Sequence, residues 1–333
     1  MKGMALTGPR KLEAVELAEP KGEGAVLVRI EQVGVCGTDL KIFAGQIPVT
    51  YPRILGHELI GRVVRAGGSF PLGTRVLVDP AIACGRCPPC LRGRPNLCPN
   101  GALMGRDVNG GFVEILAVDE GQLHRVPDSI SSAEAALIQV LGTCVHAQGE
   151  LPETEPGVAV VVGLGVAGLL HLQLLRAAGR QVVGVARSAE KRAIAMELGA
   201  TAVCSPGEAE MVVGKITDHD GAALVVEAVG KVGTLAQAVR LAFPGGTILV
   251  FGTITESTVS EPFPWYDLYF KELTIVNPRA ALGRDYDRAI ALATDGSLKL
   301  EPLWSESFPL ADASAAFEAL GPGSTRLKVT IDI

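Results

Sequence analysis

The chain has 333 residues, of which 48% are apolar and 20% charged, and its formal net charge is −6. This composition excludes intrinsic disorder, and at roughly 100 to 200 residues per domain the length predicts two domains. The acidic balance and the lack of a long basic run argue against a nucleic-acid partner. No apolar run reaches the roughly 18 residues that span a bilayer, and residues 1–10 lack a signal-peptide core, so we expect no membrane partner and a cytoplasmic location.

Short β-branched runs separated by glycine and proline occupy residues 1–145. Strands at such intervals are typical of an antiparallel, barrel-like domain. We expect strands at 25–30, 61–65, 74–78 and 111–114.

The hydrophobic period changes after Pro156. The continuous apolar run 158–162 predicts a strand buried on both faces. Such alternation of strands and helices predicts an α/β domain with a doubly wound parallel sheet over 146–285. Residues 286–333 return to strand-and-turn patterns and are expected to rejoin the first domain. The further elements expected are helices at 166–178, 189–198 and 232–241, and strands at 181–186, 222–226, 246–251, 307–310 and 327–331.

A glycine motif follows the first strand of this α/β region and precedes a helix. It fits G-x-G-x-x-G, the fingerprint that binds a dinucleotide pyrophosphate at a helix N-terminus. An ordinary strand-to-helix turn is the alternative. The cofactor-binding residues that we expect here are Gly163, Leu164, Gly165, Val166 and Gly168.

The end of the next strand should indicate which nicotinamide cofactor binds. In NAD enzymes an acidic residue about 20 positions after the glycines holds the ribose 2′-hydroxyl. Here the strand ends in Ala186-Arg187-Ser188, without a carboxylate. We therefore predict NADP, with Arg187 as the main contact to its 2′-phosphate, Ser188 assisting and Ala186 leaving room. The alternative is NAD, with Arg187 an exposed loop residue.

Four of the seven cysteines lie within 15 residues, as Cys84, Cys87, Cys90 and Cys98. In a reducing compartment, four closely spaced thiols indicate a closed tetrahedral zinc site that supports folding. An iron–sulfur or redox cluster is the alternative.

A second metal site is indicated by Cys36, in Cys36-Gly37-Thr38-Asp39, and by His57, in Gly56-His57-Glu58. With these motifs, the four-cysteine lobe, the glycine motif and the ending Leu327-Lys328-Val329, the whole chain resembles the zinc-dependent medium-chain dehydrogenase/reductase superfamily of alcohol, polyol and glucose dehydrogenases. The resemblance implies a GroES-like catalytic domain beside a Rossmann domain, two zinc ions per chain, and a homodimer or homotetramer. It implies catalytic zinc ligation by Cys36, His57 and Glu58, and cofactor contact by Lys328.

The family's remaining zinc ligand falls at Gln139, where glucose dehydrogenases of the superfamily also have glutamine. Water could complete the shell instead, and Cys144 is a weaker alternative. The resemblance also implies a proton relay through Thr38, with Lys41 as a possible outer member, and implies that Asp39 orients His57. His124, His146, His171, His219 and Cys204 are interpreted as packing or surface residues.

These features predict a zinc-dependent oxidoreductase that moves a hydride between a polar alcohol, with a polyol or sugar favoured, and NADP(H). Alternatives are an NAD-dependent aliphatic alcohol or L-threonine dehydrogenase, and an inactive cofactor-binding protein. Zinc-free reductases of the same fold would lack the cysteines. Four residues that could contact a polar substrate are Arg106, Asp107, Asn109 and Glu114.

Overall fold

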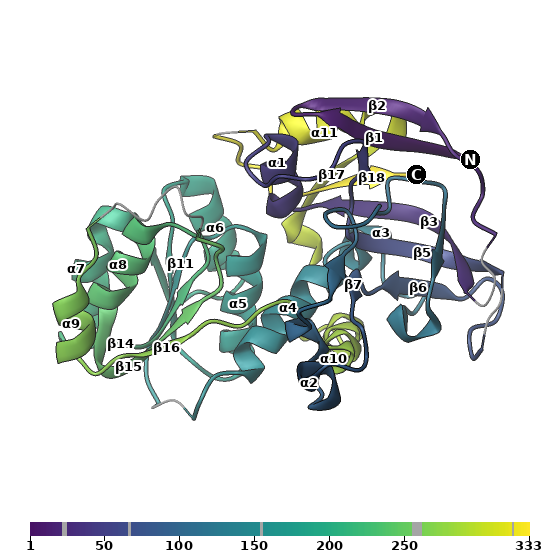
Figure 1. Ribbon diagram of the computed structural model, residues 1–333. Coiled ribbons are helices and arrows are strands. Elements are labelled where there is room, and N and C mark those ends of the chain that lie inside the picture. The colour runs from purple at the N-terminus through teal and green to yellow at the C-terminus, as the bar shows by residue number, and fades with distance from the viewer. Residues whose placement is uncertain (22–24, 66–67, 154–155, 255–261, 322) are drawn as a thin grey trace. The chain divides into compact units, whose positions relative to one another are not determined.

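The computed structural model describes residues 1–333 except 22–24, 66–67, 154–155, 255–261 and 322 (Figure 1). The chain divides into two compact units. The first comprises Met1–Gly142, Ala280–Gly296 and Leu300–Ile333, and the second Thr143–Arg279 with Ser297–Lys299. Domain limits at residues 145 and 285 stay a prediction, because compact units need not coincide with folding domains.

The first unit is mainly antiparallel. One sheet has the order β2-β1-β4, and another has the order β10-β6-β5-β3-β18-β17, with β9 also paired to β3. The C-terminal strand β18 pairs antiparallel with β3 through Val329↔Val35 and Ile331↔Val33. The strands are β1 (Lys2–Gly8), β2 (Lys11–Glu16), β3 (Val26–Val35), β4 (Arg53–Ile54), β5 (Glu58–Arg65), β6 (Arg75–Val78), β9 (Ile115–Val118), β10 (Leu123–Arg125), β17 (Trp304–Pro309) and β18 (Lys328–Asp332).

The remaining elements of this unit are short helices and one small two-stranded sheet. Its core gathers buried side chains from both sheets, among them Leu6, Val28 and Ile331, around Phe112. The elements are α1 (Gly37–Phe43), β7 (Ala81–Ile82), α2 (Pro88–Leu91), η1 (Pro95–Leu97), β8 (Ala102–Leu103), η2 (Glu120–Gln122), α3 (Ser132–Ala135), α10 (Gly283–Thr294), η5 (Glu301–Leu303), η6 (Leu310–Asp312) and α11 (Ala313–Ala319), together with the start of α4 (Ile138–Gly149).

The strand expected at 111–114 is wrong. The strand β9 begins only at Ile115, and the preceding residues form one isolated bridge, Gly3↔Val113. Backbone N–H groups of Gly111 and Phe112 donate instead to the carbonyls of Gly56 and Leu55, 3.0 and 3.1 Å away. This segment is therefore fixed by hydrogen bonds to the loop before His57 rather than by a ladder.

The second unit confirms the doubly wound α/β prediction. The six strands that the structure describes in it are all parallel, in the order β13-β12-β11-β14-β15-β16. This order places β11 at the point where successive strands switch direction across the sheet, where dinucleotides bind. The elements are β11 (Ala159–Val162), α5 (Val166–Ala177), β12 (Val182–Val185), α6 (Ala189–Glu197), β13 (Ala202–Cys204), η3 (Pro206–Glu208), α7 (Ala209–Ile216), β14 (Ala222–Glu227), α8 (Val232–Leu241), β15 (Ala242–Val250), α9 (Trp265–Phe270) and β16 (Thr274–Val276).

The lengths of the helices bear on the membrane question. Among the described residues, we find no helix with the length and apolar character that crossing a bilayer requires. Even the longest helices of the two units, α4, α5 and α10, have 12 residues each, whereas a spanning helix needs about 20.

Candidate functional site

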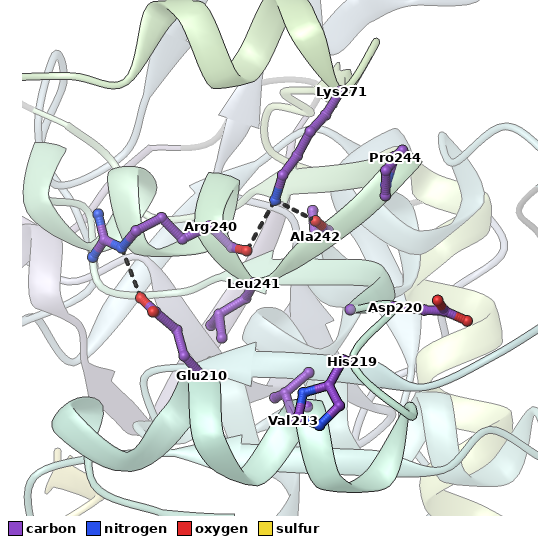
Figure 2. A pocket seen from close by; sticks show the side chains of 11 residues that line it. Glu210, Val213, His219, Asp220, Arg240, Leu241, Ala242, Pro244 and Lys271 are labelled. Carbon is purple, nitrogen blue, oxygen red and sulfur yellow. Dashed lines mark hydrogen bonds and ion pairs between the residues drawn. The ribbon is translucent and has the colours of Figure 1, made fainter.

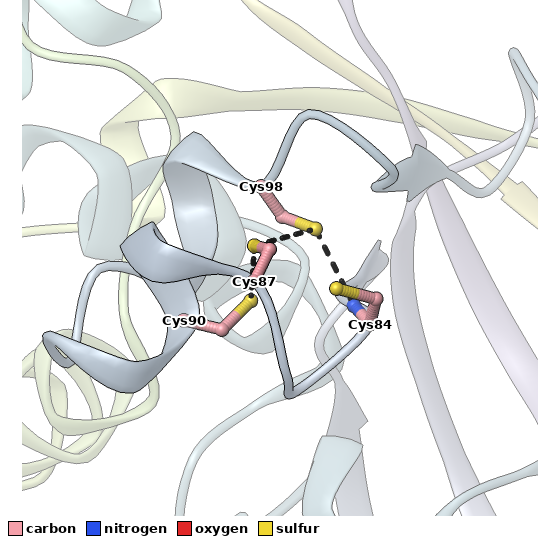
Figure 3. A group of neighbouring side chains, drawn as sticks. All are labelled: Cys84, Cys87, Cys90 and Cys98. Atoms are coloured by element: carbon pink, nitrogen blue, oxygen red, sulfur yellow. Dashed lines mark hydrogen bonds between the residues drawn. The ribbon is translucent and has the colours of Figure 1, made fainter.

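The four clustered cysteines come together at the surface of the first unit (Figure 3). Their sulfur atoms all lie within 4.8 Å of one another. Cys87 Sγ is 3.3 Å from Cys90 Sγ and 3.7 Å from Cys98 Sγ, and all four cysteines are free thiols. Sulfurs placed about 2.3 Å from a tetrahedral zinc ion lie about 3.8 Å apart. The spacing therefore suits a closed metal shell and is too wide for a disulfide.

The backbone of this lobe favours the thiolate form of one of its cysteines. Pro88 and Pro89 begin the short helix α2, and the backbone N–H of Cys84 donates to the sulfur of Cys98 at 3.4 Å. Hydrogen bonds from the backbone of Arg86 and Cys87 lower the pKa of Cys84 to about 6. Because zinc binds the thiolate, the lowered pKa of Cys84 favours metal binding at that sulfur. The backbone hydrogen bond from Cys90 lowers the pKa of Cys87, but burial and the neighbouring thiols outweigh it and raise that pKa to about 12.

A second cluster forms where α1 and β5 begin. The ligand atoms of Cys36, His57 and Glu58 lie within 4.8 Å of one another. His57 and Glu58 are buried, whereas Cys36 is half-buried. One thiol, one imidazole and one carboxylate at this separation fit a zinc site that keeps a coordination position open.

Asp39 lies beside two members of this cluster. It is fully buried, and its Oδ2 accepts a hydrogen bond from the Cys36 backbone N–H at 2.9 Å, where Cys36 caps α1. Its Oδ1 lies 3.2 Å from His57 Nδ1. Burial alone would lower the pKa of His57, but Asp39 and Cys36 raise it well above its usual value. With Nδ1 held by Asp39, Nε2 is the ring nitrogen left for a metal.

Glu58 is held by a buried lysine that comes from the far end of the chain. Lys328 Nζ donates to Glu58 Oε2 at 2.5 Å, and the two residues are 3% and 1% exposed. The other carboxylate oxygen, Oε1, is buried without a hydrogen-bond partner. A metal ion bound by Glu58 together with Cys36 and His57 would satisfy this buried oxygen.

A glycine makes room for this carboxylate. Gly34 on β3 pairs with Glu58 on β5, and a Cβ at Gly34 would lie 2.0 Å from Glu58 Oε2. Any side chain at position 34 would therefore displace the Glu58–Lys328 pair. Contact of Lys328 with a cofactor stays a prediction, because its amine is already bonded to Glu58 and, at 3.4 Å, to the carbonyl of Val35.

Gln139 is buried near the start of α4, and its Nε2 lies 3.5 Å from the hydroxyl of Tyr286. Its ligation of zinc stays a prediction. Cys144 is fully buried in the second unit, its thiol lies 3.7 Å from the carbonyl oxygen of Ala167, and burial raises its pKa. These contacts fit a packing role for Cys144.

The glycine motif has the backbone that a dinucleotide requires. Gly163 has φ +98°, and a Cβ there would lie 2.5 Å from Val229. A Cβ at Gly168 would lie 1.8 Å from the Gly163 carbonyl, so helix α5 can approach β11 only with glycine there. A Cβ at Gly165 would meet nothing within 4 Å, so the N-terminus of α5 is open to a phosphate. The side chain of Leu164 is buried, leaving its backbone available.

The loop after β12 is held by Arg192, an arginine on α6 that the sequence reasoning missed. Arg187 is exposed, and Ser188 caps α6 by accepting from Lys191 N–H at 3.2 Å while donating to Glu190 at 2.6 Å. Arg192 Nη1 donates to the carbonyls of Ala186 and Arg187 at 2.7 and 2.8 Å. The sequence signal that could have identified Arg192 was its position, one turn into the helix that follows the strand end where the cofactor is selected.

Other polar residues serve the local fold. Arg106 pairs with Asp107 at 2.7 Å, Asn109 accepts from the Ile54 N–H at 3.2 Å, and Glu114 accepts from the Lys2 N–H at 2.7 Å. Their roles as substrate contacts stay predictions. His124 is buried against Asp287, 2.8 Å away, and His171 is fully buried, which lowers its pKa to about 3.

A cavity of about 320 Å³ lies in the second unit, away from the glycine motif (Figure 2). It is lined by Gly221 and Ala242, at the amino ends of β14 and β15, whereas the motif follows the carboxyl end of β11. Lys271 donates to the carbonyls of Val239, Arg240 and Ala242, and Arg240 pairs with Glu210. The cavity's charged groups thus stabilise the end of α8.

Comparison with known proteins agrees with this geometry. The family model for the alcohol dehydrogenase GroES-like domain matches residues 22–128, and the model for zinc-binding dehydrogenases matches residues 166–295. The D-arabitol-phosphate dehydrogenase of Enterococcus avium is 28% identical, over 100% of this chain and 97% of that protein.

Two solved structures resemble the chain over 100% of its length and 99% of their own. A zinc-binding dehydrogenase from Sinorhizobium meliloti 1021 bound to NADP is 32% identical, with a TM-score of 0.89. An alcohol dehydrogenase from Escherichia coli CFT073 complexed with NADH is 26% identical, with a TM-score of 0.90. The chain has a GroES-like domain and a Rossmann domain, and it belongs to the zinc-dependent medium-chain dehydrogenase/reductase superfamily, a family of oxidoreductases that use zinc and a nicotinamide cofactor.

Proposed function

We propose that this protein oxidises a polar primary or secondary alcohol, a polyol or sugar derivative, with NADP as the hydride acceptor. The observation that carries the proposal is the cluster of half-buried Cys36 with buried His57 and Glu58, in which Glu58 Oε1 has no hydrogen-bond partner. Three protein ligands leave the fourth coordination position of a tetrahedral zinc ion open, as a catalytic metal site requires. Zinc, when bound there, would act as a Lewis acid that lowers the pKa of an alcohol.

The charge around the cluster supports an alcohol substrate. Lys328 neutralises Glu58, so these two buried charges cancel. With the thiolate of Cys36, neutral His57 and neutral Gln139, the loaded site would have a charge near +1. A more positive site lowers the pKa of a substrate hydroxyl further. The similarity to an arabitol-phosphate dehydrogenase favours a polyol or its phosphate.

The chain's own groups would position the reactants and move the proton. Asp39 holds His57 and the N-terminus of α1 in place. Thr38, two residues after Cys36 and half-buried, would accept the alcohol proton and pass it toward solvent, with Lys41 one turn further along α1. The open N-terminus of α5 at Gly165 would bind the cofactor pyrophosphate.

The cofactor proposal concerns the loop after β12. Arg187 is exposed at the strand end, residues 186–188 contain no carboxylate, and Arg192 holds the loop carbonyls. A guanidinium recognises a 2′-phosphate through paired charge-assisted hydrogen bonds. We propose that Arg187 makes this contact and that Ser188 retains its capping role while lying beside the phosphate.

Turnover of an alcohol panel with both cofactors tests the function. Polyols, polyol phosphates, aldoses, aliphatic alcohols and L-threonine are assayed with NADP and NAD. We expect a polyol or sugar derivative with NADP to give the highest kcat/KM. A charge-assisted hydrogen bond is worth about 1.5–3 kcal/mol, so Arg187→Ala should lower the NADP/NAD ratio of kcat/KM by about 10- to 100-fold.

The control for that ratio is Arg240→Ala, which removes another arginine of the same unit from the cavity at the amino ends of the strands. It should leave the ratio unchanged. An unchanged ratio in Arg187→Ala would overturn the NADP contact, whereas zinc binding without turnover of any panel member would point to a binding protein.

Self-association of the chain is proposed as well, through helix α9. Four large aromatic side chains of this six-residue helix are 71–81% exposed. Exposed apolar clusters of this size mark contact surfaces. Light scattering should give the mass of a dimer or tetramer, and replacing Tyr269 and Phe270 by aspartate should give a monomer. A monomeric wild type would contradict this proposal. The four residues are Trp265, Tyr266, Tyr269 and Phe270.

A further inference from the structure

A buried tyrosine from the C-terminal part of the first unit contacts Gln139, the residue expected to be the remaining zinc ligand. Tyr286, on α10, is 2% exposed and is among the largest fully buried side chains. Its partner Gln139 stands 147 positions earlier, on α4. The sequence therefore gives no sign of this contact, and the function proposed above assigns Tyr286 no role.

The ring of Tyr286 is fixed against the backbone of α4. A Cβ at Gly142 would lie 2.4 Å from Tyr286 Cδ1 and 2.6 Å from Cε1. Gly142 follows Gln139 by three residues, so both lie on the same face of the helix. The glycine thus lets the ring pack directly on the helix, with its hydroxyl 3.5 Å from the Gln139 side chain. On the other side, the ring of His124 lies 5.3 Å away, centroid to centroid.

The direction of the hydrogen bond bears on the chemistry of Gln139. The amide nitrogen Nε2 donates, and the phenol oxygen accepts. An amide binds a cation only through its oxygen, because its NH₂ group carries donors alone. With Nε2 turned toward Tyr286, the amide oxygen Oε1 faces away from Tyr286 and is the atom available to a cation. A reversed amide would turn its NH₂ group toward the cluster and exclude a cation.

We propose that Tyr286 is a positioning residue that fixes the Gln139 amide with its oxygen toward the catalytic metal. Tyr286 acts through Gln139 and does not itself contact the metal or the substrate. The proposal rests on the proposed function, in which Gln139 is a ligand. Groups that orient metal ligands typically change metal affinity by about 10- to 100-fold when removed.

The test measures metal binding rather than turnover. Tyr286→Phe removes one hydroxyl and keeps the ring on Gly142. Zinc affinity is measured at the site of Cys36, His57 and Gln139, the more readily exchanged of the two, by competition with a chromophoric chelator. The visible absorption of Co²⁺ bound in the same site reports its ligand set. We expect zinc affinity to fall about 10- to 100-fold and the cobalt bands to shift. Gln139→Ala should weaken binding at least as much, and adding Tyr286→Phe to it should change little.

Two further variants separate positioning from packing. Gln139→Glu offers an oxygen on either side, so Tyr286→Phe should cost less than threefold in that background. Thr294→Val removes a hydroxyl from the same helix, one that donates to the carbonyl of Ile290 at 2.6 Å. This control should leave zinc affinity unchanged.

The outcomes distinguish the inference from the proposed function. Zinc affinity within twofold of wild type and an unshifted cobalt spectrum in Tyr286→Phe, with weakened binding in Gln139→Ala, would overturn the positioning role alone. Additive losses in the double variant would also overturn it, because the two residues would then act independently. Unchanged zinc affinity in Gln139→Ala would overturn the ligand role of Gln139 and the inference with it.

Discussion

Lys328→Met is expected to lower the free energy of unfolding by about 3–5 kcal/mol, because it leaves the Glu58 carboxylate buried without its cation. Glu58 is 1% exposed and cannot recover hydration without a rearrangement. Burial lowers the pKa of Lys328, but the charges of Glu58 and Cys36 raise it by more than burial lowers it, so the net shift of the pKa is upward. A raised lysine pKa means that the stabilisation is fully present at neutral pH and is lost only as the pH rises through the folded-state value.

Urea unfolding of wild type and Lys328→Met measures this loss. Both proteins are first stripped of metal, since a cation at the cluster would neutralise part of the Glu58 charge. The control is Glu58→Gln combined with Lys328→Met, which removes both charges and should recover most of the stability. A loss below about 1 kcal/mol, or a double variant no more stable than the single one, would contradict the expected result.

Cys98→Ser should remove one zinc ion per chain. Cys98 is 6% exposed, its sulfur lies 3.7 Å from that of Cys87, and it accepts from the Cys84 backbone N–H at 3.4 Å. A serine hydroxyl is not among the usual zinc ligands, and structural zinc binds with about 10–16 kcal/mol in small peptides. The lobe at 84–98 should therefore lose its order. Its three remaining thiols should react faster with a thiol reagent.

Metal analysis by mass spectrometry gives the stoichiometry, expected to fall from two to one. The matched control is Cys204→Ser, which changes a buried cysteine of the second unit that is not part of either cluster. Cys204→Ser should keep both zinc ions. Equal zinc content in wild type and Cys98→Ser, or an equal loss in the control, would contradict a four-thiolate site.

Local patterns predicted the second unit well. The apolar run at 158–162 contains β11, and the expected helix at 232–241 has the bounds of α8. Both faces of β11 are buried, so the sequence shows a continuous apolar run, and the helices α5, α6, α7 and α8 each begin within a few residues of a strand end. The glycine motif lies within a single turn, so its geometry was readable as well.

Contacts between distant segments were not readable. Glu58 and Lys328 are separated by 270 positions. A lysine on a buried strand can pair with a carboxylate or bind a cofactor, and no local sequence pattern distinguishes these two roles. Gly34 became informative only once β3 and β5 were paired. The expected strand at 111–114 failed for the same reason, because distant backbone groups of Leu55 and Gly56 take its hydrogen bonds.

The separation of Glu58 from Lys328 also has a consequence for synthesis. Translation at about 5–20 residues per second needs roughly 15–55 s to extend the chain by the 270 positions between them. During that interval the nascent chain contains Cys36, His57 and Glu58 but not the amine that neutralises the carboxylate. The first unit also takes strands β17 and β18 from these last residues, so the Glu58–Lys328 ion pair can form only once the C-terminal strands have been synthesised.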